Sequence, residues 1–115
     1  MHENTRACVA YVALKPSGFS LNAVYDYLKS KYISIDGTVT ETKVNIYDYD
    51  RSCYFGGDGK SLYDYGLSSY VDFELKGKSF EGYDYKSSNY FSGTISGSNV
   101  SLYDYATSKY YEFSK

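Results

Sequence analysis

The sequence of 115 residues has no tryptophan, one histidine, one proline and two cysteines. With His2 as the only histidine, no Ser-His or Cys-His pair for nucleophilic catalysis can be placed within a folded core. Cys8 and Cys53 are too few for a disulfide framework and lack the spacing of zinc ligands. We therefore expect no enzyme, no catalytic residue, no metal site and no cofactor.

The chain also lacks an excess of charge and a long apolar run. Its 12 Lys and Arg residues nearly balance 14 Asp and Glu residues, and the net charge of -2 gives no field that attracts nucleic acid. The longest apolar stretch, residues 7–14, falls far short of the ~20 residues that a membrane helix needs. We expect no membrane span, and interpret residues 7–14 as a first β-strand.

Tyrosine is abundant, with 17 residues, and most of it belongs to an internal repeat. The pattern Tyr-Asp-Tyr-x-x-Ser-x-Tyr occurs five times, and the other positions vary between copies. The first tyrosines of successive copies lie 22, 16, 20 and 20 residues apart. The five copies are residues 25–32, 47–54, 63–70, 83–90 and 103–110.

Each copy reads as two strands that meet at a loop, because side chains alternate with period two on both sides of the motif. In the last copy, Val100, Leu102 and Asp104 share one face of the strand. Ser101 and Tyr103 lie on the opposite face. The pattern therefore predicts an apolar inner face and an outer face of tyrosine and polar residues.

Glycines between the copies indicate tight turns at the other end of the sheet. The sequence thus predicts one all-β domain over residues 1–115, an antiparallel meander of about ten short strands. Closing it into a small barrel or a two-layer sandwich would bury the apolar face. A parallel solenoid is the alternative, but it would stack the five motif aspartates in one like-charge column.

The first copy allows a second interpretation. Leu21, Val24, Leu28 and Tyr32 have helical spacing, and Ser20 could cap a helix there. Residues 18–33 are therefore either a hairpin, which the complete motif favours, or a short N-terminal helix.

The motif aspartate repeats in every copy, which raises the question of metal binding or acid-base chemistry. A structural role explains it better, because an aspartate just before a loop can accept backbone N–H groups of the turn. The motif serine would add a second acceptor. Five equivalent carboxylates also do not make the single asymmetric site that catalysis needs.

The tyrosines remain as candidates for binding, because a ring with a hydroxyl tip offers both stacking and hydrogen bonds. The sequence predicts a non-catalytic interaction module that presents a Tyr-rich surface to a glycan or protein partner. The alternative is a self-assembling structural or adhesin-type repeat protein, which would form homo-oligomers. The predicted binding residues are the first tyrosines of the motif, Tyr25, Tyr47, Tyr63, Tyr83 and Tyr103.

Overall fold

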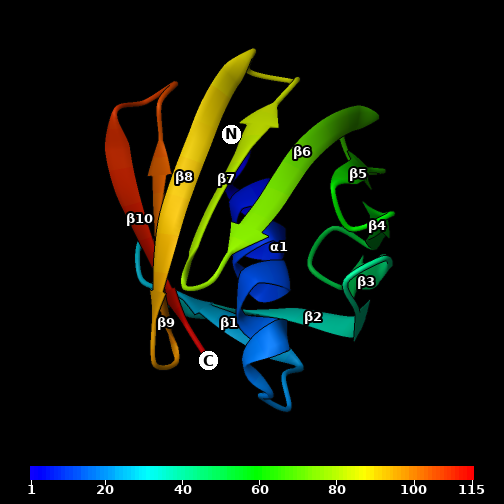
Figure 1. Ribbon diagram of the computed structural model, residues 1–115, viewed down its shortest axis with the longest axis vertical. Helices are drawn as coiled ribbons and strands as arrows, with labels where there is room; N and C mark the ends of the chain where they lie inside the picture. Colours follow the sequence, from blue (N-terminus) through cyan, green and yellow to red (C-terminus); the bar gives the residue numbers. More distant parts are fainter.

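All five motif copies form β-hairpins, and the computed structural model, which describes residues 1–115, joins them into one closed barrel (Figure 1). Every strand pairs antiparallel with its neighbours in sequence, and β1 pairs with β10 to close the sheet. The strands are β1 (Ala23–Asp26), β2 (Lys31–Val39), β3 (Val44–Asp48), β4 (Cys53–Gly57), β5 (Ser61–Asp64), β6 (Ser69–Lys76), β7 (Ser79–Asp84), β8 (Asn89–Ser96), β9 (Asn99–Asp104) and β10 (Lys109–Ser114). The predicted ten-strand antiparallel meander is confirmed, in its barrel form.

One helix, α1 (Glu3–Leu14), lies inside the barrel, where every residue from Asn4 to Leu14 is buried (Figure 1). The prediction of a strand over residues 7–14 is therefore wrong. A segment enclosed by a closed sheet has no free strand edge to pair with, so it must satisfy its backbone groups internally, as only a helix does. Because the barrel wall surrounds it, the helix is apolar on all sides over residues 7–14 and shows no amphipathic period there.

The ends of α1 are set by local sequence. The Nδ1 atom of His2 accepts the N–H of Asn4 at 3.0 Å, which caps the first turn. At the other end the chain continues into a short 3₁₀ turn, η1 (Lys15–Ser17), which contains Pro16. Gly18 then reverses the chain with φ of 89°, a left-handed conformation that glycine adopts without steric cost.

Residues 18–33, for which the sequence allowed two structures, contain the hairpin of β1 and β2. Val24 pairs with Ile33, and both are buried. The helical alternative for this segment is wrong, because the spacing of Leu21 and Val24 reflects burial against the core rather than one helical face.

Each motif loop contains four residues and is built by its aspartate and serine. The Oδ1 atom of Asp64, for example, accepts the N–H groups of Gly66 and Leu67 at 2.9 and 3.2 Å. The motif serine has a role that the sequence did not predict: Ser68 and its four counterparts adopt φ of 52° to 56°. The serine thus supplies the left-handed residue that ends the loop, rather than a second side-chain acceptor.

The inner face follows the predicted alternation and meets the helix in one core of 25 buried hydrophobic residues. Two glycines make room for aromatic rings on this face. A Cβ on Gly82 would lie 2.4 Å from the ring of Phe91, its cross-strand partner, and one on Gly93 would lie 2.2 Å from the ring of Phe80. These rings therefore lie flat against the neighbouring strand, where they fill the space beside the helix.

Candidate functional site

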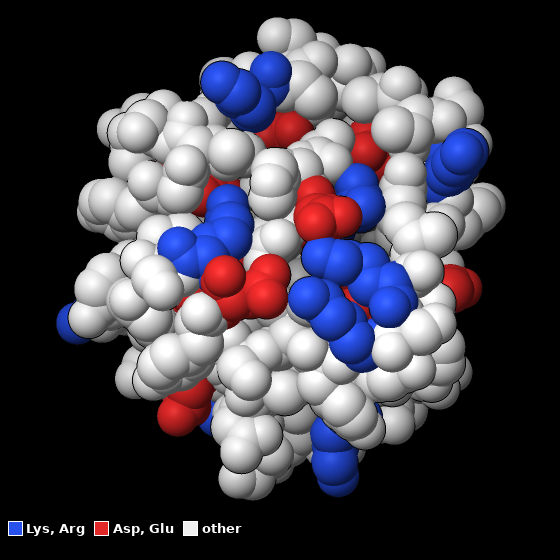
Figure 2. All heavy atoms as spheres, turned by 180° about the vertical axis from the view of Figure 1, so that it is seen from behind, with Lys and Arg blue, Asp and Glu red and all other residues white.

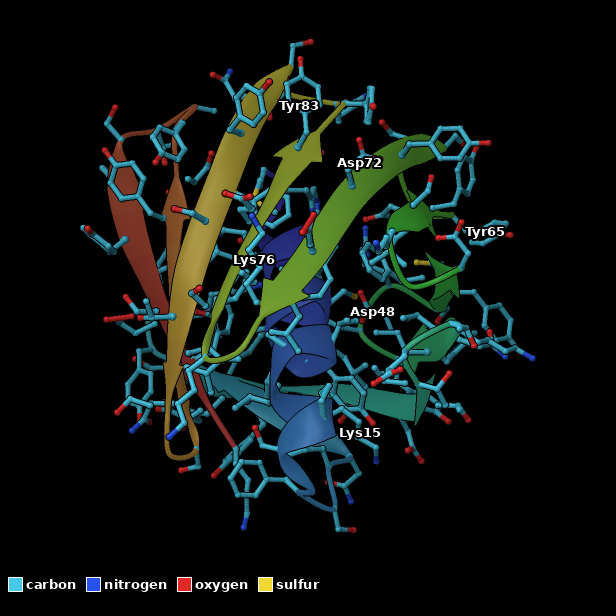
Figure 3. All side chains as sticks on the ribbon, in the orientation of Figure 1. Lys15, Asp48, Tyr65, Asp72, Lys76 and Tyr83 are labelled. Carbon is cyan, nitrogen blue, oxygen red and sulfur yellow. The ribbon has the colours of Figure 1, made fainter.

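The motif tyrosines form a belt on the outside of the barrel. All five motif loops lie at the same end of the sheet, because odd-numbered strands run toward it and even-numbered strands run away from it. The three tyrosines of each copy therefore meet on the outer surface near this end, and Tyr65 points away from the barrel in Figure 3. We call this set of five three-ring clusters the tyrosine belt.

Within each cluster, one central ring packs between two flanking rings. Tyr83, for example, lies 4.8 Å from Tyr85 and 4.9 Å from Tyr90 between ring centroids, with the planes at 76° and 75°. This edge-to-face geometry places the positive edge of one ring against the negative face of another. The same arrangement recurs in the other clusters, Tyr25 with Tyr27 and Tyr32, Tyr47 with Tyr49 and Tyr54, Tyr63 with Tyr65 and Tyr70, and Tyr103 with Tyr105 and Tyr110.

The five residues predicted as the binding set are the central rings. Tyr25, Tyr47, Tyr63, Tyr83 and Tyr103 are half-buried between their neighbours. The flanking rings are the exposed ones, with 50% to 70% of their surface accessible. The exposed surface of each cluster therefore comes from the third and eighth motif positions, and the central ring supports these two rings.

The motif aspartates form an inner ring at the same end of the barrel. Asp26, Asp48, Asp64, Asp84 and Asp104 are at most 2% exposed. They lie on every second strand, and the residues paired beside them are uncharged or basic: Asp64, for instance, lies between Phe55 and Ser69. The barrel thus avoids the like-charge column that a solenoid would create.

Two helix side chains donate hydrogen bonds to this acidic ring, and one arginine neutralises part of its charge. The side chains of Asn4 and Thr5 donate to Asp48 and Asp64, respectively. Arg51 bridges the same two carboxylates, with Nε 2.6 Å from Asp48 and a terminal nitrogen 2.9 Å from Asp64. The positive end of the helix dipole also faces this ring.

On the other side of the ring, the α-ammonium of Met1 lies 2.9 Å from Asp104 and 3.8 Å from Asp84. The Oδ1 atom of Asp84 has no hydrogen-bond partner, whereas Oδ1 of Asp104 accepts the N–H of Ala106 at 2.9 Å. These contacts hold the helix, the loops and the wall together. No group of three or more His, Cys, Asp and Glu side chains in the chain has an arrangement that could hold a metal ion.

Both cysteines are free thiols near this ring. Burial raises the pKa of Cys8 well above its ordinary value, and a sulfur-nitrogen distance of 3.8 Å joins its Sγ to Arg51. Burial also raises the pKa of Cys53. Because the thiolate is the reactive form, these shifts oppose nucleophilic behaviour at neutral pH.

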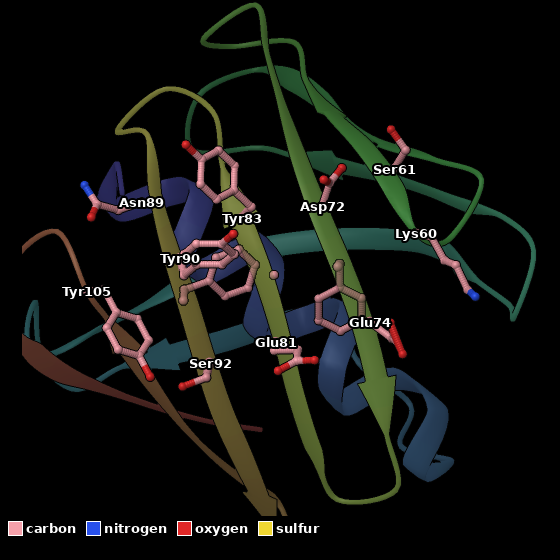
Figure 4. A pocket seen from close by; sticks show the side chains of 13 residues that line it. Lys60, Ser61, Asp72, Glu74, Glu81, Tyr83, Asn89, Tyr90, Ser92 and Tyr105 are labelled. Atoms are coloured by element: carbon pink, nitrogen blue, oxygen red, sulfur yellow. The ribbon is translucent and has the colours of Figure 1, made fainter.

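A groove of about 810 Å³ crosses the outer surface of β5 to β8 beside the belt (Figure 4). The rings of Tyr83 and Tyr90, from the fourth cluster, and Tyr105, from the fifth, line it together with polar side chains. The polar lining residues are Lys60, Ser61, Asp72, Glu74, Glu81, Asn89 and Ser92.

Tyr85 and Lys76 contact the acidic side chains of the groove. The hydroxyl of Tyr85 donates to Oδ2 of Asp72 at 2.8 Å, and this hydrogen bond raises the pKa of Tyr85. Lys76 donates to Oε1 of Glu81 at 2.8 Å and lies 3.8 Å from Glu74. One oxygen of Asp72 and one of Glu81 remain free to accept further hydrogen bonds.

Figure 2 shows the face of the molecule that is turned away from the viewer in Figure 1. On this face, Lys and Arg side chains are interspersed among Asp and Glu. The chain's single long helix, α1, falls short of the length and apolar character required to traverse a membrane. Comparisons of this chain with protein-family models, curated protein sequences and solved structures gave no match.

Proposed function

We propose that this chain is a non-catalytic interaction module that binds a glycan through the tyrosine belt. One observation carries the proposal: exposed tyrosine rings from two neighbouring clusters line a groove that also contains carboxylate, amide and hydroxyl groups. Aromatic faces stack on the C–H faces of sugar rings, and polar groups beside them bind the hydroxyls. A sugar chain needs both in one concave surface.

Two features favour this proposal over the other function classes. Helix α1 fills the lumen, so the barrel interior offers little room for the cargo of a ligand carrier. Closure of the sheet leaves no free barrel edge along which copies could pair, so self-assembly would need side-chain contacts instead. The rings would also suit a protein partner, but the free carboxylate oxygens of Asp72 and Glu81 beside them favour a ligand that carries hydroxyl donors.

The chemistry available inside the barrel supports a non-catalytic role. His2 uses Nδ1 to cap α1, and the carboxylates of Asp48 and Asp64 are occupied by loop, helix and Arg51 contacts. The buried carboxylates thus contribute to folding rather than facing a substrate.

A glycan array probed with the labelled, purified chain tests the proposal, with hits verified by isothermal titration calorimetry. We expect saturable binding to a defined glycan class and a monomer in solution scattering. An array without hits, together with concentration-dependent oligomers, would instead favour the assembly alternative.

A further inference from the structure

The tyrosine belt repeats five times, but the groove belongs to one part of it. Strands β7 and β8 carry Tyr83 and Tyr90 of the fourth cluster, and Tyr105 of the fifth cluster extends the same concave surface. The groove crosses four adjacent strands, which corresponds to roughly 14 Å at the usual strand spacing. A surface of this length suits several consecutive sugar rings rather than one.

The groove contains many hydrogen-bond acceptors. Asp72 and Glu81 each keep one oxygen free, because Tyr85 and Lys76 occupy the other. An ionised carboxylate only accepts hydrogen bonds, so its natural partner here is a group that donates. Sugar hydroxyls are such donors, and each bond to a carboxylate is stronger than one to a neutral acceptor.

The negative charge of the groove favours uncharged glycans over anionic ones. Three carboxylates of the lining, those of Asp72, Glu74 and Glu81, outnumber the two ammonium groups near them. These are Lys60 in the lining and Lys76, which lies 2.8 Å from Glu81 and 3.8 Å from Glu74. A uronic acid or sulfated sugar would bring its own anions next to these carboxylates, which costs free energy. An uncharged sugar chain brings hydroxyl donors and no charge.

We propose that this groove binds an uncharged glycan chain. Sugar rings stack on Tyr90 and Tyr105, and their hydroxyls donate to Asp72 and Glu81. This inference rests on the proposed function and adds the site and the class of ligand. It also means that the fourth and fifth tyrosine clusters bind the ligand and the other three do not, although all five share the same motif.

Matched tyrosine variants test the site. Tyr90 and Tyr54 occupy the same motif position, are 67% and 53% exposed, and pack against central rings at 4.9 and 4.7 Å, but only Tyr90 lines the groove. We expect Tyr90→Ala to weaken binding of the best uncharged hexasaccharide by at least about tenfold. Tyr54→Ala should leave it unchanged. Both substitutions remove an equivalent surface ring. If the two variants have the same unfolding curve, a loss of stability does not explain the difference in binding between them.

Charge variants test the ligand class. The double variant Asp72→Asn and Glu81→Gln keeps the shape of the groove but removes two charges. We expect it to bind the uncharged hexasaccharide about fivefold more weakly, because neutral acceptors form weaker hydrogen bonds. Its affinity for a hexagalacturonate should rise. Glu112→Gln, an exposed change on β10 away from the groove, is the control.

The outcomes separate the inference from the proposed function. A panel of immobilised glucans, mannans, galactans and chitin fragments, set beside uronic-acid and sulfated glycans, provides the probes. Binding to uncharged chains that Tyr90→Ala weakens at least about tenfold and Tyr54→Ala leaves unchanged supports both. Binding confined to anionic glycans, or equal losses in Tyr90→Ala and Tyr54→Ala, overturns the inference while glycan binding stands. A panel without any binding overturns both.

Discussion

The inner and outer faces of the barrel use the same five motif copies in opposite ways. On the outside, the clusters are nearly identical, with central-to-flanking distances of 4.7 to 4.9 Å in every copy. On the inside, the aspartates differ, because helix α1, Arg51 and the α-ammonium of Met1 contact some of them and not others. Asp64 receives Thr5 and Arg51, for example, whereas Asp26 receives only the amides of its own loop.

The difference shows how a repeated sequence acquires unequal sites. Outside, neighbouring copies make the same contacts, so the sequence repeat is also a structural repeat. Inside, helix α1 occurs only once, so it contacts some of the motif aspartates and not the others. On the outer face, only the differing strand lengths and polar residues between the copies distinguish one cluster from the next, and the groove lies where these change.

The largest expected effect separates two inner copies. Asp64→Ala should lower the free energy of unfolding by about 3–5 kcal/mol, because it leaves the half-buried Arg51 with one carboxylate instead of two. It also removes the acceptor of the Thr5 hydroxyl and of two loop amides. Asp26→Ala should cost about 1–3 kcal/mol, since only two loop amides lose their acceptor. Urea unfolding measures both free energies. Equal losses of stability in the two variants would contradict the claim that the inner aspartates contribute unequally.

A substitution in the helix sharpens the same comparison. Thr5→Val keeps the shape of the side chain but removes the hydroxyl that donates to Asp64, so we expect a loss of about 1–3 kcal/mol. The loss should shrink when Asp64 is already Ala, which a double-mutant cycle measures. Additive losses would show that Thr5 acts without Asp64.

On the outer face the copies should behave alike. Tyr47→Ala and Tyr103→Ala each remove a central ring with two edge-to-face contacts, so each should cost about 1–3 kcal/mol. We expect the two values to agree within about 0.5 kcal/mol, as thermal or urea unfolding would reveal. A larger difference would mean that the clusters are not energetically equivalent.

The smallest effect concerns pH. The hydrogen bond to Asp72 raises the pKa of Tyr85 above its ordinary value of 10.0, because losing the proton would place two anions together. The associated stabilisation is present below the unfolded-state pKa and disappears as pH rises through the higher folded-state pKa. In an NMR titration the ring of Tyr85 should ionise at lower pH in Asp72→Asn than in the unmodified chain, and an unchanged pKa would contradict the role of this hydrogen bond.

Several elements could be predicted from local sequence because their patterns are local. Alternation in Val100, Leu102 and Asp104 correctly predicted the inner face, and the motif aspartate correctly predicted the capped loop. The prediction failed for residues 7–14, since an apolar run without period fits a buried strand and a buried helix equally well. The exposed acceptors of the groove come from residues between motif copies, which share no pattern that would bring them together.

The sequence by itself determined the hairpins, their turns and the side of the sheet that each residue faces, because these depend on neighbours a few positions apart. Only the tertiary structure decided that β1 meets β10, that α1 occupies the lumen, and that Tyr90 lines a groove while Tyr54 does not. These features depend on how many strands surround the helix and how long each strand runs. They arise from contacts between segments far apart in the chain, which no local period encodes.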